Sequence, residues 1–294
     1  MKEFIMLVGL PGSGKSTYAR DHFTDNTKYV GSDAIRAELY GDESIQGNPA
    51  EVFKVMLQKT TEALQFDDVR VIYDATNIKK KHRLATLMQL PKDIIKRCVI
   101  VWAPYDTCVL RDSLRSRVCG EEVIKQMIMN FEVPTYDEGW SIIQRYVSDS
   151  EHLFGVLDVD LDIPHDNPHH NNTIEEHIYN VTNQVNLLFM LDKVDYITFE
   201  ILHDVARFHD IGKPFTKTFT NLKGETKEVA HYYGHHNVSA YLYVGYPCYF
   251  TTREIEIASI INMHMMKFLN PRGVNKLTAR QQYLLNLFVE CDVE

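Results

Sequence analysis

The sequence has no long hydrophobic run and only five cysteines among its 294 residues. No apolar stretch approaches the roughly 20 residues that a membrane-spanning helix needs, so we expect no membrane partner. No two cysteines have CxxC spacing, which argues against a disulfide framework and a zinc knuckle and favours the reducing cytoplasm. The chain also lacks internal repeats and low-complexity tracts, so we expect an ordinary globular protein.

Histidine is scarce in the first half of the chain, and positive charge is scarce in the second. Only two of the 13 histidines precede residue 150. Residues 1–120 hold 18 Lys and Arg against 15 Asp and Glu, whereas residues 121–294 hold 13 against 25. The acidic, histidine-rich half therefore suggests a metal site. The mildly basic half could contact phosphates, but the net charge of -9 argues against wrapping long duplex DNA.

The first half alternates short apolar runs with amphipathic stretches. Strands are expected at 4–8, 69–73 and 98–102, and helices near 16–21, 33–40, 50–65, 80–90, 105–117, 121–131 and 137–147. This alternation predicts an α/β domain over 1–150, with a parallel sheet and helices on both faces. The run at 4–8 resembles a signal-peptide core, but it is short and leads directly into a Gly-rich loop, so we expect the first core strand.

The second half contains few strand-like runs and is expected to be an all-α domain over 165–294. The boundary should lie in 149–170, a stretch rich in Asp, Pro and Asn, with a linker at 151–164. Helices are expected near 173–190, 196–209, 235–243, 252–268 and 278–291. One polar interruption at 216–232 predicts a hairpin that turns at Lys223 and Gly224.

Residues 9–17, GLPGSGKST, match the phosphate-loop pattern G-x-x-x-x-G-K-[ST] and directly follow an expected strand. Glycines allow the backbone to fold closely around a phosphate chain, and its N–H groups bind the anion. Lys15 should reach the β- and γ-phosphates of ATP, and the Ser16 hydroxyl should bind Mg²⁺. A plain flexible turn is the disfavoured alternative. The residues expected to bind the nucleotide are Gly12, Ser13, Gly14, Lys15, Ser16, Thr17 and Arg111.

Three later features suggest a phosphoryl acceptor site. Asp33 stands at the start of an expected helix, where it is either a capping residue or a catalytic one. Asp74 ends a buried strand, where it is either part of a turn or an indirect partner of Mg²⁺. Arg111 and Arg115 share one helical face, and Arg117 follows. These arginines form either a lid over transferring phosphates or a solvated basic face.

The runs GLPGSGKST, SDAIR, YDATN and LRDSLRSRVCGEEVI, in this order, resemble the 5′-polynucleotide kinase family of P-loop phosphotransferases over about residues 1–145. The resemblance implies that Asp33 is the general base, that Arg36 binds the acceptor phosphate and that Arg115 stabilises the transferring phosphoryl group. The sequence departs from the family at Asp112, where asparagine is usual. Kinases of small acceptors share the loop and a similar lid. The basic run 79–83 could steer a nucleic-acid strand, but a solvated helix face is favoured.

The stretch RFHDIGKPF, residues 207–215, places a His-Asp pair next to a glycine at an expected helix end. A catalytic dyad would need a nucleophile, and no G-x-S-x-G motif is present. A metal site would need further ligands, and the candidates are His177, His209, Asp210, His235, His236, His264 and Asp292. Imidazoles with a carboxylate favour Mn, Fe, Co, Ni, Zn or Mg in an open site. The pair His203-Asp204, six residues upstream, lies about 240° away around a helix and cannot face the same ion.

The order H…HD…H…H…D resembles the HD-domain phosphohydrolases over about residues 165–294. The resemblance implies a helical domain with one or two divalent ions that hydrolyses a phosphomonoester or phosphodiester. The first ion would be held by His177, His209, Asp210 and Asp292. A second would be held by His235, or His236 in its place, and His264. Lys213 is either a phosphate contact or a solvated lysine, and His170 could lie near the site. Asp292 is followed by two residues, so either the chain given is truncated or this ligand is loosely held.

Together the two halves predict a bifunctional enzyme that heals RNA or DNA ends, with RNA favoured because cyclic phosphate ends arise only there. One half would phosphorylate a 5′-hydroxyl with ATP and Mg²⁺, and the other would remove a 3′- or 2′-phosphate or open a 2′,3′-cyclic phosphate. An RNA or DNA ligase would be a functional partner, because it needs a 5′-phosphate and a 3′-hydroxyl. The alternatives are a nucleoside or nucleotide kinase fused to a nucleotide phosphohydrolase, and a helical half that acts only as a scaffold.

Overall fold

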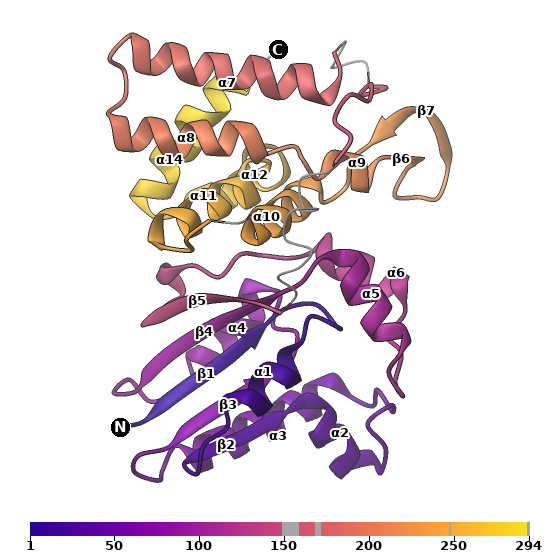
Figure 1. Cartoon of the computed structure of the whole chain (residues 1–294), viewed down its shortest axis with the longest axis vertical. Coiled ribbons are helices and arrows are strands. Elements are labelled where there is room, and N and C mark those ends of the chain that lie inside the picture. Colours follow the sequence, from indigo (N-terminus) through magenta and orange to yellow (C-terminus); the bar gives the residue numbers. More distant parts are fainter. Residues whose placement is uncertain (149–158, 168–171, 247, 293–294) are drawn as a thin grey trace. The chain divides into compact units, whose positions relative to one another are not determined.

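The computed structural model describes residues 1–148, 159–167, 172–246 and 248–292 (Figure 1). The chain divides into two compact units. The first contains Met1–Met127 and Pro134–His152, and the second contains Ile128–Val133 and Leu153–Glu294. Within the described residues, every helix is too short or too polar to cross a membrane.

A five-stranded sheet in the order β2-β3-β1-β4-β5 is the centre of the first unit, and all of its strand pairs are parallel. Its strands are β1 (Glu3–Val8), β2 (Thr27–Gly31), β3 (Arg70–Asp74), β4 (Ile95–Trp102) and β5 (Ile142–Val147). All six residues of the central strand β1 are buried, which explains its uninterrupted apolar run. In this register Leu7 pairs with both Asp74 and Val99, so the phosphate loop and Asp74 leave the sheet at the same edge. The predicted α/β fold with a parallel sheet is confirmed.

Helices connect the strands of this unit and pack beside the sheet (Figure 1). They are α1 (Lys15–Asp21), α2 (Ser32–Tyr40), α3 (Pro49–Ala63), α4 (Lys80–Leu87), α5 (Tyr105–Ser113) and α6 (Glu121–Ile128). The helix predicted at 137–147 is wrong: a 3-10 turn at Tyr136–Glu138 leads into β5. The run IIQRYV is rich in β-branched and aromatic residues and pairs along β4, which overrides any helical pattern. Helices expected to reach residues 117 and 131 end earlier, at Ser113 and Ile128.

Arg83 is a core residue and not part of a solvated basic face. Its side chain is fully buried and makes two hydrogen bonds with Glu138, of 2.7 Å from Nε to Oε2 and 2.6 Å from Nη2 to Oε1. A third donor reaches the carbonyl of Asn77 at 3.1 Å. Trp140 Nε1 donates to the same carboxylate at 3.1 Å. The pair therefore fixes α4 against the turn before β5, and the favoured interpretation of Arg83 is wrong.

The second unit is mainly helical, as predicted (Figure 1). Its helices are α7 (Ile174–Met190), α8 (Tyr196–Phe208), α9 (Lys213–Thr216), α10 (His235–Gly245), α11 (Thr252–Met263), α12 (Met266–Leu269), α13 (Pro271–Val274) and α14 (Ala279–Cys291). The predicted hairpin is present as β6 (Thr218–Thr220) and β7 (Thr226–His231), with Gly224 in the left-handed region at φ 81°. The single helix expected at 252–268 is divided at His264 and Met265. Both residues keep near-helical dihedrals, so the division is a local tightening of one helical path.

Side-chain caps fix where the long helices of this unit begin. Thr173 and Glu176 form a capping box at α7, and Thr251 and Glu254 form another at α11. At α8 the Asp195 carboxylate accepts a hydrogen bond of 2.7 Å from the Thr198 N–H. These caps set the register in which each helix presents its buried face, and the buried faces carry the histidines described below.

The segment Ile128–Val133 follows α6 in the chain but packs as part of the second unit. Phe131 is fully buried, and its ring meets that of Tyr241 edge to face at 5.2 Å. From the sequence, this stretch was predicted to belong to the first half.

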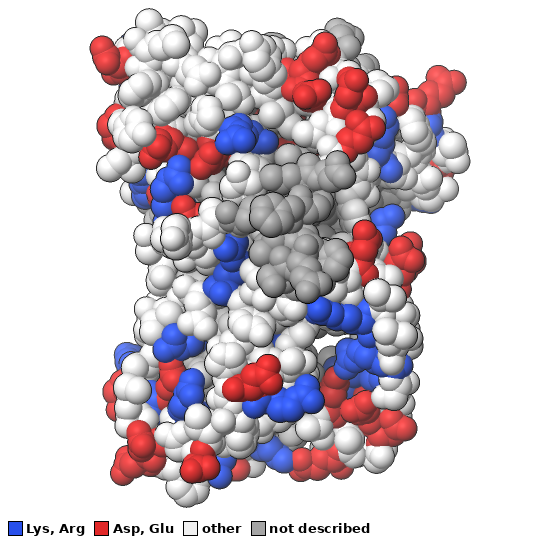
Figure 2. All heavy atoms as spheres, viewed as in Figure 1, with Lys and Arg blue, Asp and Glu red and all other residues white. Residues whose placement is uncertain are grey.

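Figure 2 shows acidic and basic side chains interspersed on one face of the molecule, so the described part of that face has no broad basic surface.

Candidate functional sites

The phosphate loop joins β1 to α1 and depends on glycine at two positions. Gly12 and Gly14 have φ angles of 76° and 93°, in the left-handed region. A Cβ on Gly12 would lie 2.2 Å from the carbonyl oxygen of Cys108. A Cβ on Gly14 would lie 2.9 Å from Cβ of Ser148. The loop is therefore packed too closely to be a flexible turn.

Polar side chains converge beside the phosphate loop. Lys15 Nζ donates to the carbonyl of Leu10 at 2.7 Å. Burial lowers the pKa of Lys15, and the negative charge of Asp74 partly opposes this effect. Ser16 Oγ donates to Asp74 Oδ2 at 2.9 Å, so the structure brings together the two residues expected near Mg²⁺. Tyr29, which the sequence analysis missed, donates to the same oxygen at 2.8 Å. A hydroxyl and a carboxylate are the hard oxygen donors that Mg²⁺ prefers.

The other loop residues differ in accessibility. Ser13 is fully buried, and Thr17 is exposed. Arg111 on α5 donates to Ser148 Oγ at 2.9 Å and lies beside Gly14. Arg111 therefore stands next to the loop, as a nucleotide contact requires.

Asp33 lies within a group of three arginines. Arg36 Nη1 contacts its Oδ1 at 2.8 Å, and Arg115 Nη2 contacts its Oδ2 at 3.4 Å. Arg117 forms a third ion pair with Oδ1, which the sequence analysis did not anticipate. The expected base and one expected phosphate contact thus share a helix turn, and the second expected contact, 82 residues away in the chain, joins them.

Asp112 is buried and holds the turn that follows the arginines. Its Oδ2 accepts hydrogen bonds from the N–H groups of Cys119 at 2.8 Å and Gly120 at 3.0 Å. An asparagine could accept the same bonds through its amide oxygen. The departure from the family pattern at this position therefore keeps the hydrogen bonds that shape the turn.

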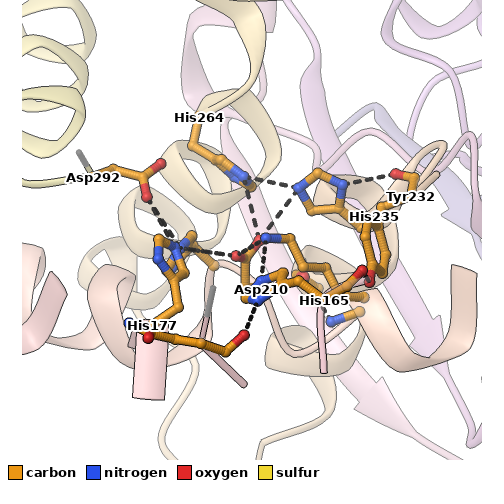
Figure 3. Close-up of polar contacts among 12 residues, drawn as sticks. His165, His177, Asp210, Tyr232, His235, His264 and Asp292 are labelled. Atoms are coloured by element: carbon orange, nitrogen blue, oxygen red, sulfur yellow. Dashed lines mark hydrogen bonds and ion pairs between the residues drawn. The ribbon is translucent and has the colours of Figure 1, made fainter. Parts of the chain in front are cut away.

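The pair His209-Asp210, which follows α8, lies in a buried cluster of imidazoles and carboxylates (Figure 3). In a first group, Nε2 of His177 lies 3.2 Å from Nε2 of His209 and 3.2 Å from Oδ1 of Asp292. Asp210 Oδ2 lies 3.3 Å from His209 Nε2 and 3.4 Å from His177 Nε2. The group joins α7, the end of α8 and the C-cap of α14, so Asp292 lies with the other expected ligands.

A second group lies on the other side of the same carboxylate (Figure 3). Nε2 of His235, the first residue of α10, lies 3.1 Å from Nε2 of His264 and 3.3 Å from Asp210 Oδ1. His236 lies outside both groups. Of the two adjacent histidines, the structure places His235 in the cluster. Asp210 thus directs one oxygen to each group, so it could contribute a ligand to an ion held by either.

Backbone carbonyls orient three of these rings through Nδ1. The acceptor is three residues upstream in each case: His209 to Ala206 at 2.9 Å, His235 to Tyr232 at 2.8 Å and His264 to Ile261 at 2.7 Å. A carbonyl only accepts, so Nδ1 carries a proton in each ring, and a ring that is neutral has its lone pair on Nε2.

The cluster fits divalent cations. Lone pairs on facing Nε2 atoms repel one another at these distances unless a positive charge lies between them. Oδ1 of Asp210 is buried and accepts no hydrogen bond from any described residue. This unsatisfied oxygen, together with the histidine lone pairs, provides the N/O donor set of a transition-metal site.

The pKa values support the same conclusion. Burial opposes charge on His209, but Asp210 and Asp292 overcome it and raise its pKa to about 10. Burial lowers the pKa of His235 to about 4 and that of His264 to about 3. Without a metal, His209 therefore holds a second proton that a bound cation would replace, whereas the rings of His235 and His264 are neutral and able to coordinate.

A buried lysine stands beside the cluster. Lys213 Nζ lies 2.6 Å from Asp210 Oδ2 and 3.0 Å from His165 Nε2. His165 Nδ1 is 2.8 Å from the carbonyl of Asn172, which leaves Nε2 to accept from the ammonium group. Tyr232 lies below Lys213, with 5.5 Å from Nζ to the ring centroid, and its hydroxyl donates to the carbonyl of His165. Lys213 is thus not a solvated lysine. The sequence analysis missed His165 and Tyr232, although a histidine 12 residues before His177 was a usable signal.

A cavity of about 720 Å³ opens onto the cluster. Its lining combines the ligands with apolar side chains of α12 and of the residue before it, among them Met265, Phe268 and Leu269. A cavity of this volume accepts a ligand the size of a nucleotide.

The look-alike pair at 203–204 faces elsewhere. Asp204 forms ion pairs with Arg253 at 3.0 Å and with Arg207 at 3.8 Å. The helical-angle argument for choosing His209-Asp210 is therefore consistent with the side-chain positions. His169 and His170 lie outside the described residues.

Comparison with known proteins supports the predicted fold of the first unit. Residues 4–134 match the family model of an AAA domain, so the N-terminal part is a P-loop kinase-like domain. No curated protein matches the chain. Among solved structures, the chain resembles one titled as a Pnkp1/Rnl/Hen1 complex, with 27% identity, a TM-score of 0.34 and coverage of 40% of each chain. It also resembles one titled as the Pnkp1/Rnl/Hen1 RNA repair complex, with 22% identity, a TM-score of 0.39 and coverage of 44% of this chain and 43% of the other. The chain spans about two fifths of the length of either.

Proposed function

We propose that this protein heals nucleic-acid ends, with a 5′-hydroxyl kinase in the first unit and a metal-dependent phosphohydrolase in the second. The observation that carries the proposal is the presence of two separate phosphate-handling centres on one chain. One has a carboxylate among arginines beside a phosphate loop. The other has a carboxylate shared by two histidine groups.

In the kinase, Asp33 accepts the proton of the acceptor hydroxyl as its oxygen attacks the γ-phosphorus of ATP. The bond to the β,γ-bridging oxygen breaks and ADP leaves. Lys15 stabilises the phosphates, while Ser16 and Asp74 supply oxygens for Mg²⁺. Without a substrate, the arginines neutralise Asp33. Bound phosphates would compete for Arg36 and Arg115, which frees the carboxylate to act as a base only when both substrates are present.

Two arginines beside the expected base, one for each of two phosphates, suit an acceptor that carries its own phosphate. Arg115 would stabilise the transferring group, and Arg36 would bind the phosphate that follows the terminal nucleoside. A polynucleotide end has such a phosphate, and a free nucleoside does not. This difference favours a nucleic-acid end as the acceptor.

In the phosphohydrolase, divalent ions held by the two groups would act as Lewis acids and lower the pKa of water. The chain's own residues orient the substrate. The Lys213 ammonium would bind a phosphate oxygen at Asp210, and His165 with Tyr232 would hold that lysine in place. Phosphate removal from a 3′-end leaves the hydroxyl that a ligase needs, and the kinase supplies the 5′-phosphate. An RNA end is the favoured substrate, and an RNA ligase is the functional partner.

The test uses one RNA oligonucleotide with a 5′-hydroxyl and a 3′-phosphate, incubated with γ-labelled ATP, Mg²⁺ and Mn²⁺. Wild type should label the 5′-end and release the 3′-phosphate. Asp33→Ala should lose only the first activity, and Asp210→Ala only the second. His203→Gln, in the look-alike pair, is the matched control and should keep both. If the oligonucleotide stays unlabelled while the protein hydrolyses ATP, the kinase proposal is wrong. If neither the oligonucleotide nor a mononucleotide loses phosphate with Mn²⁺, Co²⁺ and Ni²⁺ in turn, the helical unit is a scaffold.

A second candidate is a nucleotide kinase fused to a nucleotide phosphohydrolase. The nucleotide-sized cavity over the metal cluster favours it. Competition between the oligonucleotide and mononucleotides decides the matter. A kcat/KM for mononucleotides above that for the oligonucleotide would select this second function.

A further inference from the structure

We propose that residues 128–133 are a positioning element of the phosphohydrolase centre, which they serve by holding in place the two helix ends that carry His235 and His264. The inference deepens the proposed function of the second unit and rests on it. The segment, here called the strap, begins with the last residue of α6 and belongs to the second unit.

Asn262 binds the strap in the way that a neighbouring β-strand would. Its Oδ1 accepts from the Val133 N–H at 3.0 Å, and its Nδ2 donates to the Phe131 carbonyl at 3.0 Å. The N–H and C=O of residues two apart lie on the same side of an extended chain, so one amide group satisfies both. Asn262 is two residues before His264, at the end of α11.

Asn237 on α10 makes a third contact with the strap. Its Nδ2 donates to the Met129 carbonyl at 2.7 Å, and its Oδ1 accepts from Asn262 Nδ2 at 2.7 Å. Asn237 is two residues after His235. The two amides therefore join the strap, α10 and α11 in one hydrogen-bonded network, and each helix contributes a histidine of the second group.

Close packing at the start of α10 adds a steric constraint. Gly234, the residue before His235, has φ 73°, and a Cβ there would lie 2.6 Å from the Met129 carbonyl oxygen. Phe131 closes the other side of the strap against Tyr241. The contacts of the strap named here reach α10, α11 and Gly234. They stabilise the elements of the second group and leave those of His177, His209 and Asp292 to other contacts.

Loosening the strap should therefore weaken the binding of one ion more than that of the other. The test compares full-length wild type, Asn262→Ala and Asn237→Ala. The control is Phe199→Ala, which removes a ring stacked at 4.5 Å on Phe189 within the same unit and away from the strap. Titration with Co²⁺, followed by calorimetry and visible absorption, should give two ions per wild-type chain. In both asparagine variants one of the two should bind about 10- to 100-fold more weakly, as for other groups that orient ligands. Phe199→Ala should bind both ions as wild type does.

Hydrogen exchange of the metal-free proteins tests the strap independently of any ion. Asn262→Ala should accelerate exchange in α10 and at the end of α11, whereas Phe199→Ala should accelerate it in α7 and α8. Unchanged exchange in α10 and α11 would refute the strap, whether or not metal binds. If the two ions lose affinity equally in the asparagine variants, or if Phe199→Ala also binds an ion more weakly, the selective role of the strap is refuted. A wild type that binds no Co²⁺ would instead refute the metal centre, and hydrogen exchange would still decide whether the strap joins the two helices.

Discussion

The substitution Gly212→Ala tests how closely the two ligand groups must be packed. Gly212 follows the HD pair by two residues, and its N–H donates to Ser239 Oγ at 2.9 Å. Its φ of -84° suits any residue, so the cost of alanine is purely steric. The new Cβ would lie 2.4 Å from the His235 carbonyl oxygen and 2.7 Å from the Ser239 N. Restoring an ordinary contact of 3.4 Å requires α10 to move by about 1 Å relative to the HD turn.

Such a movement would change the 3.3 Å separation of His235 Nε2 and Asp210 Oδ1. We expect a loss of about 1–3 kcal/mol in unfolding free energy from overpacking. A displacement of 1 Å at reacting groups costs about 100-fold in rate, so phosphohydrolase kcat should fall by that order while the kinase is unchanged. Thermal unfolding and release of 3′-phosphate from the oligonucleotide measure the two effects.

Gly224→Ala is the matched control for Gly212→Ala. Gly224 has φ 81° and open space around its Cβ position, so alanine there costs about 1–2 kcal/mol of backbone strain without any steric clash. It should destabilise the same unit by a similar amount and leave the phosphohydrolase intact. If Gly212→Ala keeps kcat within twofold of wild type, or if Gly224→Ala loses as much, the argument from close packing is wrong.

Three further outcomes are expected. Gly12→Ala should raise the KM for ATP at least tenfold and spare the phosphohydrolase, because its Cβ would clash with the Cys108 carbonyl at 2.2 Å; an unchanged KM would contradict the tight loop. Arg83→Leu should cost about 3–5 kcal/mol in urea unfolding, since it leaves the Glu138 charge buried, and Arg83→Leu with Glu138→Leu should recover most of it. Dialysis against EDTA should lower the Tm of the helical unit, because it removes bound metal. Adding back Mg²⁺ alone should then restore the kinase, whereas the phosphohydrolase should also need Mn²⁺ or Co²⁺. An unchanged Tm after EDTA would count against bound metal.

The phosphate loop and the HD pair could be found in the sequence because their chemistry is local. Four or five neighbouring residues determine the turn of GLPGSGKST, and an uninterrupted apolar run identifies a central parallel strand. The strand β5 was mistaken for a helix because its burial depends on β4, which is far away in the sequence. Arg83 was mistaken for a solvated residue for the same reason, since its partner Glu138 is 55 residues away.

The sequence alone determined which residues have the chemistry for the two proposed phosphate sites, because residue type and spacing limit what a loop or helix can bind. It also excluded His203-Asp204, because the periodicity of one helix suffices for that. Only the tertiary structure decided which donors meet. In the structure, His235 and not His236 lies in the cluster. Lys213 is buried between Asp210 and His165, and the strap belongs to the helical unit. These are contacts between distant segments, and their geometry depends on how whole helices pack, which no local pattern encodes.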